Sequence, residues 1–411
     1  MASALWGKIY YQDTYVGELR QEPGGRCVFT YDAAYLDARR PAIAFTLPLG
    51  AQPHICEQGL HPFFDNLAAE GWLRNAQARA LKVDARNRFA LLLAFGQDCA
   101  GAVTVIDPTP RDLSIELNDT LAGAAVKSRA SLSGIQPKVL AVREGRSFRP
   151  ARGDERSTYL AKLPSGTLRD IVENEYLTTT ACRALLPDDR IVELEIAPLK
   201  GVQDRALLVR RFDRMPSGAR LHFEEFNQLL GHRADDDRAK YDASYEDMAE
   251  FILATPGCTP VDAWRLCQRV LACFLTGNTD AHLKNFAMFH TPDGLRLTPA
   301  YDLVAAALYD FPALALRIGN AEDFPIVDLK PKHIIKLGKA HGLDRAALGE
   351  IVRVLGLKRK TAELAVRRQA GRIEAVALGD NLLAFMEKRW NGTFASIGKL
   401  LSKKPSGDDD Q

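Results

Sequence analysis

Eight residues in the last third of the chain carry side chains well suited to chemistry. Residues 278–285 read Asn-Thr-Asp-Ala-His-Leu-Lys-Asn, so Asp280 is followed five positions later by Asn285. An apolar stretch and a second carboxylate, Asp302, come after them. Protein kinases place a catalytic base, a metal-binding amide and a metal-binding carboxylate in this order. The spacing predicts phosphoryl transfer, with a capped turn between two helices as the alternative.

The three residues would divide the work of such a reaction. Asp280 would accept the proton of an attacking hydroxyl, Asn285 would bind magnesium, and Asp302 would bridge the metal to the phosphates of ATP. Phosphoryl transfer needs little covalent help from the protein, so two carboxylates and an amide supply most of a site. An Asp and an Asn at this spacing occur by chance in many chains, and a second element is therefore required.

That second element lies far upstream. Residues 131–138 read Ser-Leu-Ser-Gly-Ile-Gln-Pro-Lys and precede an apolar run at 139–142. A small turn ahead of a strand can direct backbone N–H groups at phosphate oxygens. Further on, Lys162 lies inside a short apolar strand, where a lysine is rarely buried without a partner. In kinases such a lysine binds the phosphates and pairs with a helix glutamate.

Two glutamates, Glu173 and Glu175, open the helix-like stretch that follows Lys162. The sequence does not decide which of them would pair with the lysine. For Lys162 itself, the alternative is a surface lysine on an edge strand.

These segments, taken together, resemble the HipA-type toxin kinases of bacteria. The resemblance also includes Asn-Glu-Tyr at 174–176, Arg-Arg-Phe-Asp-Arg at 210–214 and Pro-Ala-Tyr-Asp-Leu at 299–303. Order and spacing match from about residue 126 to about residue 310, and the first 120 residues look like the small domain that precedes the kinase in that family. The chain lacks a Gly-x-Gly-x-x-Gly loop and a His-Arg-Asp motif, as this family does, which argues against a eukaryotic-type kinase.

The resemblance implies a fold and an activity. The fold would be α+β, a two-lobed protein-kinase-like domain with a mixed small lobe and a helical large lobe, preceded by a small α+β domain. The activity would be that of an ATP- and Mg²⁺-dependent serine/threonine-protein kinase that acts as a toxin. Its implied protein substrate is an aminoacyl-tRNA synthetase, glutamyl-tRNA synthetase first. Its implied partner is a HipB-like helix-turn-helix antitoxin, and operator DNA would be contacted only through that complex.

The same resemblance implies which residues contact the nucleotide. They come from the upstream turn, the lysine strand, the strand before the hinge, and the two catalytic segments: Ser133, Gly134, Ile135, Gln136, Pro137, Lys138, Lys162, Arg210, Arg211, Phe212, His282, Lys284, Asn285, Tyr301 and Asp302. Asn285 and Asp302 would be the metal ligands. We interpret His282 as a residue that orients or packs the loop. Lys284 would neutralise the transferred phosphate, with a solvated loop lysine as the alternative.

The upstream turn also carries a candidate regulatory site. In the resembling family, the serine three positions before the turn glycine is phosphorylated by the kinase itself, and this position is Ser131. Ser133 makes a Ser-x-Ser-Gly variant and would share or modify that control. A phosphate adds a charge of about −1.5 to −2 beside the expected ATP phosphates, so repulsion would inhibit the enzyme. The sequence does not decide which serine is modified.

Composition narrows the class of protein. The chain has 411 residues, 46% of them hydrophobic and 26% charged, with a net charge of +2, so nothing global requires a nucleic-acid or membrane partner. Seven scattered cysteines without a C-x-x-C pair favour reduced thiols over disulfides or structural zinc. No apolar run approaches 18 residues, and charges interrupt the amino terminus before a signal-peptide core. We therefore expect a cytoplasmic protein.

Hydrophobic periodicity predicts the domain organisation. An α+β domain covers residues 1–120, with a linker at roughly 107–125. The kinase domain covers 126–402, its small lobe about 126–215 and its helical lobe about 216–402, and a polar disordered tail covers 403–411. Strands are expected at 5–11, 15–19, 27–31, 102–106, 138–142, 158–163, 191–199 and 205–212. Helices are expected from Phe63 through Leu73 and at 88–95, 171–186, 245–253, 261–276, 344–355, 361–377 and 379–388.

Two rival functions stay open. A small-molecule or lipid kinase of the same fold would use the same carboxylates. A non-catalytic, antitoxin-binding corepressor would keep the fold, although the intact set of Lys162, Asp280, Asn285 and Asp302 argues against it. Seven carboxylates between Glu224 and Asp247 are interpreted as a solvated loop and not as an acidic metal cluster. The phosphorylated protein, toxicity and oligomeric state do not follow from the sequence.

Overall fold

The structure is a computed structural model that describes residues 5–109, 136–153 and 155–401. Its residues group into two compact units. Unit 1 comprises Met1–Val172, Val192–Lys240 and Ala287–His290, and unit 2 comprises Glu173–Ile191, Tyr241–Phe286 and Thr291–Gln411. The predicted tail and nearly all of the predicted linker lie outside the described residues, and the predicted domain boundaries stay predictions.

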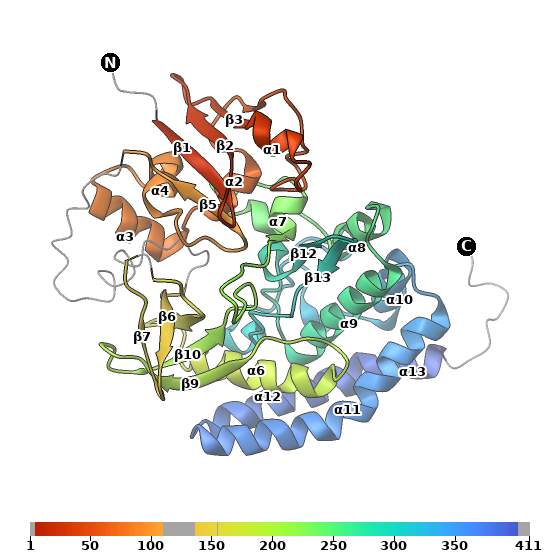
Figure 1. Cartoon of the computed structure of the whole chain (residues 1–411). Coiled ribbons are helices and arrows are strands. Elements are labelled where there is room, and N and C mark those ends of the chain that lie inside the picture. The colour runs from red at the N-terminus through yellow and green to blue at the C-terminus, as the bar shows by residue number, and fades with distance from the viewer. Residues whose placement is uncertain (1–4, 110–135, 154, 402–411) are drawn as a thin grey trace. The chain divides into compact units, whose positions relative to one another are not determined.

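The amino-terminal part of unit 1 is built on a five-stranded antiparallel sheet. Its strands are ordered β4-β3-β2-β1-β5, with β1 Leu5–Tyr11, β2 Thr14–Gln21, β3 Cys27–Tyr31, β4 His54–Cys56 and β5 Val103–Ile106. Strands β1, β2, β3 and β5 are labelled in Figure 1. The predicted hairpin is confirmed, because β1 and β2 pair antiparallel from Leu5↔Gln21 to Tyr11↔Thr14, with one register shift between Ile9 and Tyr10. In β3 the alternate residues Cys27, Phe29 and Tyr31 are buried in one core cluster, as the period of two in a strand requires.

Four helices accompany this sheet: α1 Ala33–Asp37, α2 Pro62–Leu67, α3 Gly71–Leu81 and α4 Arg88–Phe95. The predicted helix from Phe63 through Leu73 is wrong, because the chain leaves helical geometry at Ala68 and restarts at Gly71. The buried Arg88 explains the break. Its guanidinium pairs with Asp65 at 2.5 Å and donates hydrogen bonds to the carbonyls of Asp65 and Ala69, which stabilises the non-helical turn between the two helices.

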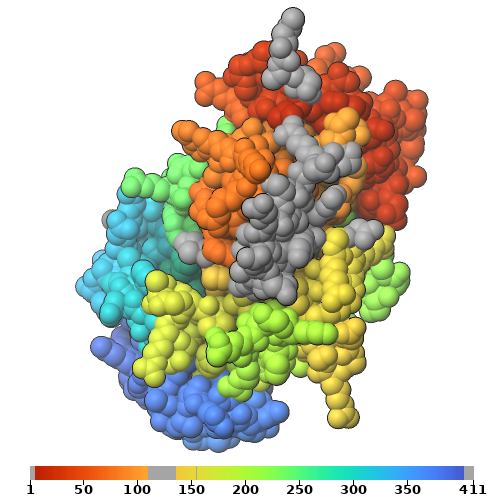
Figure 2. Space-filling model, turned by 90° about the vertical axis from the view of Figure 1, so that its left-hand side faces the viewer, coloured from red at the N-terminus to blue at the C-terminus, as the bar shows by residue number. Residues whose placement is uncertain are grey.

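A second antiparallel sheet in unit 1 corresponds to the predicted small lobe. The strand order is β7-β6-β8-β10-β9, and the surface of these strands is coloured yellow and lime in Figure 2. The bounds are β6 Lys138–Glu144, β7 Ser147–Pro150, β8 Tyr159–Lys162, β9 Leu194–Pro198 and β10 Arg205–Arg210. The four predicted strands are all present, and β8 lies in the middle of the sheet. Helix α6, Ile171–Leu185, follows as predicted.

Unit 1 also contains a short ribbon that the sequence did not predict in this form. Strand β11, Phe223–Glu225, pairs antiparallel with β12, Ala287–Thr291, in the register Phe223↔Phe289. Helix α7, Phe226–Leu229, continues directly from β11. The apolar segment expected after Asn285 is therefore a strand.

Unit 2 is largely helical. Its main helices are α8 Tyr245–Ala254, α9 Pro260–Thr276, α10 Pro331–Ala340, α11 Arg345–Arg372, α12 Val376–Arg389 and α13 Ala395–Leu401, and it also contains strand β13, Gly294–Leu297. Helix α12 packs against both α9 and α11. Helix α9 is buried along almost its entire length from Leu266 to Thr276. Among the described residues, no helix combines the length and apolar character that crossing a membrane requires.

Helix α11 corrects one expectation. Separate helices were predicted at 344–355 and 361–377, but the structure has a single helix over Arg345–Arg372. Gly356 lies inside this helix. A Cβ there would lie 2.7 Å from the Trp390 ring, so the glycine makes room for that ring. The predicted N-cap is confirmed, since the Asp344 carboxylate accepts a hydrogen bond of 2.7 Å from the Ala347 N–H.

Candidate active site

The loop at 278–285 begins where helix α9 ends. Gly277 terminates the helix in the left-handed conformation with φ of 78°, and a Cβ at this position would lie 2.8 Å from the Phe385 ring. A residue other than glycine would therefore be strained and would also displace that ring. The turn fixes the direction in which the chain leaves the helix.

One side chain of this loop differs from the others in exposure. The loop lies entirely within the described residues, and seven of its eight residues are buried, including Thr279, Ala281 and Leu283 at 1% exposure or less. Asp280 is the exposed one. Burial of its neighbours holds the backbone while the carboxylate faces solvent, as a group that must meet a substrate requires.

Hydrogen bonds within the loop define its shape. The His282 ring accepts from the Lys284 N–H at 3.3 Å, and the His282 N–H donates to Asn285 Oδ1 at 2.9 Å. The Tyr301 hydroxyl donates to the Lys284 carbonyl at 2.8 Å. His282 therefore orients the loop, in line with its interpretation from sequence. Lys284 is only 5% exposed, so the solvated alternative for it is wrong.

Asn285 and Asp302 are brought together in unit 2. Asn285 Nδ2 donates to Asp302 Oδ2 at 2.8 Å across 17 residues of sequence. Asp302 adopts φ of 57°, a left-handed conformation that is uncommon for residues other than glycine. Backbone strain of this kind clusters at functional sites. Amide and carboxylate oxygens are ligands that Mg²⁺ accepts, and Asn285 Oδ1 keeps a second lone pair, so this pair fits a magnesium ion.

A buried asparagine holds the segment that follows Asp302. Asn174 is 1% exposed, and its side chain bonds both backbone groups of Ala305, donating to the carbonyl at 3.2 Å and accepting from the N–H at 2.8 Å. Sequence reasoning quoted this asparagine only as part of a motif and missed its positioning role. Of the two candidate glutamates beside it, Glu175 is buried at 1% exposure, whereas Glu173 is partly exposed.

Tyr241 is a second residue that the sequence did not single out. Its hydroxyl donates to Asp280 Oδ1 at 3.2 Å, and its ring meets the His282 ring edge-on with centroids 5.3 Å apart. It lies within the segment rich in carboxylates that was interpreted as a solvated loop. No local signal marks it, because 38 residues separate it from Asp280.

The predicted phosphate-binding lysine lies in unit 1. Lys162 is on the middle strand β8 and only 5% exposed, so the alternative of a surface lysine on an edge strand is wrong. Lys138 on β6 is its direct cross-strand neighbour, and both side chains therefore point to the same face of the sheet. Two lysines on one face of a sheet suit the binding of an anion such as a phosphate.

Only part of the upstream turn can be placed. Gln136 Nε2 donates to the Leu163 carbonyl at 2.8 Å, and the Leu163 N–H donates to the Pro137 carbonyl at 2.9 Å. These bonds attach the end of the turn to the strand that carries Lys162. The predicted residues Ser131, Ser133, Gly134 and Ile135 lie outside the described residues.

The predicted hinge residues use their side chains elsewhere in unit 1. Arg210 pairs with Glu193 at 2.9 Å, and the Phe212 ring packs against Phe223 and Phe289. Arg211 pairs with Asp98 at 3.1 Å and with Asp213 at 2.9 Å. The contact of these three residues with the nucleotide stays a prediction.

The partners of Arg211 form a buried charge network with Arg214. Burial opposes ionisation of Asp98, yet the guanidinium groups of Arg211 and Arg214 hold the pKa of its carboxyl below the ordinary value. Arg214 bonds Asp98 at 2.5 Å and Asp213 at 2.7 Å, so two arginines share two carboxylates. Asp98 lies just before β5 in the sequence, and Arg211 and Arg214 follow β10. These ion pairs therefore join the amino-terminal part of unit 1 to the segment after β10.

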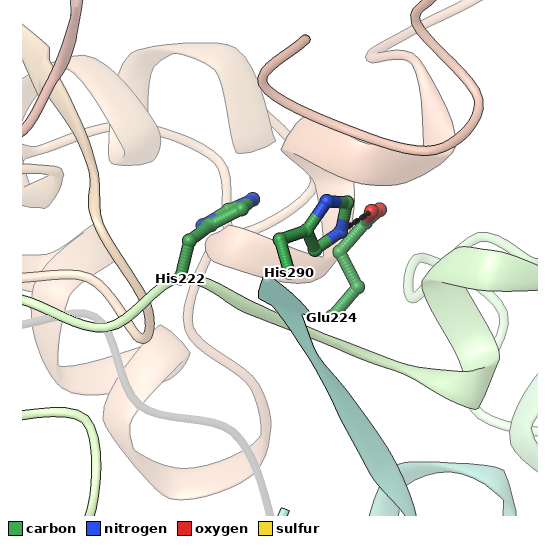
Figure 3. Close-up of side chains that lie close together, drawn as sticks. All are labelled: His222, Glu224 and His290. Carbon is green, nitrogen blue, oxygen red and sulfur yellow. Dashed lines mark hydrogen bonds and ion pairs between the residues drawn. The ribbon is translucent and has the colours of Figure 1, made fainter. Parts of the chain in front are cut away.

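A cluster of possible metal ligands lies outside these segments. His222, Glu224 and His290 offer ligand atoms within 4.8 Å of one another, and Figure 3 shows the His290 ring and the Glu224 carboxylate facing each other. Glu224 is fully buried, so its interpretation as part of a solvated loop is wrong. Its Oε1 accepts from the Phe45 N–H at 2.7 Å and bonds His290 Nε2 at 2.7 Å.

Hydrogen bonds also account for His222 in this cluster. Its Nδ1 accepts from the Ala102 N–H at 3.3 Å, so Nε2 carries the proton and donates to the Ile43 carbonyl at 2.8 Å. Burial lowers the pKa of His222 well below its ordinary value, which keeps the ring neutral. Both ring nitrogens are engaged with the backbone, and a cation would have to displace one of these bonds. We therefore assign no metal to this cluster.

Comparisons with known proteins agree with the order of these segments. The model of the HipA-like C-terminal domain matches residues 130–375, and that of the HipA N-terminal domain matches residues 7–106. The chain is 33% identical over 317 residues to the putative kinase Y4dM of Sinorhizobium fredii, covering 72% of this chain and 75% of the relative. It is 29% identical over 283 residues to the serine/threonine-protein kinase toxin HipA of Shewanella oneidensis, covering 60% and 63%.

A solved structure shows the same fold. The similar chain comes from the complex of Shewanella oneidensis HipA, HipB and operator DNA, with a TM-score of 0.74 at 23% identity, covering 96% of this chain and 99% of that one. The predicted fold class is confirmed: a mixed α+β kinase-like fold that follows an amino-terminal sheet domain in the sequence.

Glu224 gives a test of the hydrogen-bonded cluster. Glu224→Ala should lower the free energy of unfolding by about 2 kcal/mol, because it empties a fully buried side-chain position and removes the acceptor of the hydrogen bonds from Phe45 and His290. Chemical denaturation measures this loss. Glu350→Ala, which removes an exposed carboxylate paired with Arg353, is the control and should leave the midpoint nearly unchanged. Equal losses in the two variants would contradict a cluster held by hydrogen bonds. A wild-type denaturation midpoint that falls on addition of EDTA would contradict the assignment of no metal to it.

Proposed function

Because this chain belongs to the HipA family of serine/threonine kinases, we propose that it is the ATP- and magnesium-dependent kinase toxin of a toxin–antitoxin pair. Membership makes the chain a kinase, and kinases use ATP. The single observation that supports the assignment of the site is the Asn285–Asp302 hydrogen bond beside the exposed Asp280. It holds a metal-binding amide and carboxylate together next to a carboxylate that solvent can reach.

The proposed reaction transfers the γ-phosphoryl group of ATP to a protein hydroxyl. The hydroxyl oxygen forms the new bond to phosphorus, the bond to the bridging oxygen of ADP breaks, and Asp280 accepts the hydroxyl proton. Asn285 and Asp302 would hold magnesium, which neutralises charge on the phosphates when bound. Lys138 and Lys162 would bind phosphate oxygens, which the adjacent cations on β6 and β8 support.

The acceptor and partners are proposed from the family. The acceptor would be a serine or threonine of an aminoacyl-tRNA synthetase, glutamyl-tRNA synthetase first. The similar Shewanella protein forms a complex with HipB and operator DNA, and this chain would bind a HipB-like antitoxin in the same manner. A net charge of only +2 supports contact with operator DNA through the antitoxin and not through this chain alone.

Control of the enzyme is proposed to lie in the upstream turn. The resemblance supports self-phosphorylation at Ser131, with Ser133 as a second acceptor. A phosphate at either position would repel the phosphates of bound ATP. The position is supported by the described end of the turn, where Gln136 and Pro137 attach it to the lysine strand.

Asp280→Asn tests the assignment of the base. The change removes proton acceptance and one charge from an exposed side chain, so phosphoryl transfer should fall by about 10²–10⁴-fold while the fold is kept. Transfer of label from γ-³²P-ATP to glutamyl-tRNA synthetase, and ATP hydrolysis with water as acceptor, measure the loss. Asp293→Asn, at another exposed aspartate, should retain wild-type rates. A wild-type rate in Asp280→Asn would remove this residue from the mechanism.

Ser131 and Ser133 test the proposed control. After incubation of the purified chain with ATP and Mg²⁺, mass spectrometry should find phosphate on Ser131 or Ser133, and activity should decline as it accumulates. The double variant Ser131→Ala, Ser133→Ala should stay active longer, because it cannot gain the inhibiting charge. An active wild-type enzyme with phosphate on neither serine would leave the turn without a regulatory role.

A further inference from the structure

The proposed base already has a hydroxyl within hydrogen-bond reach. The Tyr241 phenol donates to Asp280 Oδ1 at 3.2 Å. A general base must lie about 2.6–3.2 Å from the oxygen whose proton it accepts. The phenol oxygen of Tyr241 therefore lies at the distance from Asp280 that the hydroxyl oxygen of an acceptor also requires.

The main chain brings Tyr241 to this place. Just after it, the Ala243 carbonyl accepts from the Arg317 N–H at 3.0 Å, and the Tyr245 N–H donates to the Arg317 carbonyl at 3.1 Å. Two residues before Arg317, the Ala315 N–H donates to the Thr279 carbonyl at 2.7 Å. The segment at 315–317 thus links the backbone beside Tyr241 to the backbone beside Asp280.

The side chain of Arg317 reinforces the same link. It pairs with Asp242 at 3.0 Å and lies 3.8 Å from Asp247. Both carboxylates follow Tyr241 in the chain, so the stretch that carries the tyrosine is held by charges as well as by backbone bonds.

The ring of Tyr241 packs against the His282 ring. Its edge-on contact with His282 has an interplanar angle of 76°, and the side chain is partly exposed. The hydrogen bond to Asp280 and this ring contact are two of the interactions that place the ring beside the base. Rotation of the side chain would release Asp280 without disturbing the backbone link.

We propose that Tyr241 is an internal occupant of the acceptor position, which a substrate hydroxyl displaces and water does not. This inference rests on the proposed role of Asp280 as base and adds a specificity-determining residue to that site. A single neutral hydrogen bond changes an occupancy by a factor of about two to ten. Such an occupant suppresses transfer to water while yielding to a protein acceptor that makes further contacts.

The test uses the full chain with ATP and Mg²⁺ and no protein acceptor, so that water is the only external acceptor. Tyr241→Phe keeps the ring and removes the phenol oxygen, and ATP hydrolysis should rise about two- to tenfold with the KM for ATP unchanged. Tyr241→Ala, which also removes the ring, should raise hydrolysis at least as much. Tyr35→Phe is the matched control, because it removes a phenol bonded to the Pro41 carbonyl at 2.8 Å, and it should keep the wild-type rate.

The outcomes separate this inference from the proposed function. If Tyr241→Phe hydrolyses ATP at or below the wild-type rate and has wild-type thermal stability, Tyr241 does not occupy the acceptor position. Its role would then be structural only. Hydrolysis that persists in Asp280→Asn would instead overturn the proposed base. A rise in Tyr241→Phe that disappears in the double variant Tyr241→Phe, Asp280→Asn supports both.

Discussion

The hydrogen bond between Asn285 and Asp302 is the interaction on which the site depends. It joins the end of the buried loop after helix α9 to a residue held at φ of 57°, and the same asparagine accepts the His282 N–H through its oxygen. One side chain thus sets both the shape of the loop and the position of the carboxylate. Asn174 holds the segment that follows Asp302, because its side chain bonds both the N–H and the carbonyl of Ala305.

Burial and exposure divide the remaining roles. The buried neighbours of Asp280 fix the loop so that this one residue is exposed, and the Tyr241 hydroxyl donates a hydrogen bond to its carboxylate. In unit 1, two lysines share one face of the sheet through the pairing of β6 with β8. These lysines and carboxylates are the groups to which we assign the proposed phosphoryl transfer, each fixed by packing in its own unit.

Local patterns predicted much of this. Periodicity gave the β1–β2 hairpin and the strands around Lys162, and the Asp344 cap followed from residue type. Errors arose where distant residues intervene. Arg88 breaks the helix expected from Phe63 through Leu73, and Trp390 makes Gly356 a packing glycine inside α11. Glu224 is buried because Phe45 and His290 supply its bonds, and no local signal pairs Tyr241 with Asp280.

Metal binding tests the central claim most directly, since the account makes Asn285 and Asp302 the ligands. Electron paramagnetic resonance can count Mn²⁺ bound by the chain in the presence of ADP. The account predicts about one or two Mn²⁺ for the wild type, weaker binding in Asn285→Ala and loss of binding in Asp302→Ala, with Asp293→Asn unchanged. Wild-type Mn²⁺ binding in Asp302→Ala would contradict it.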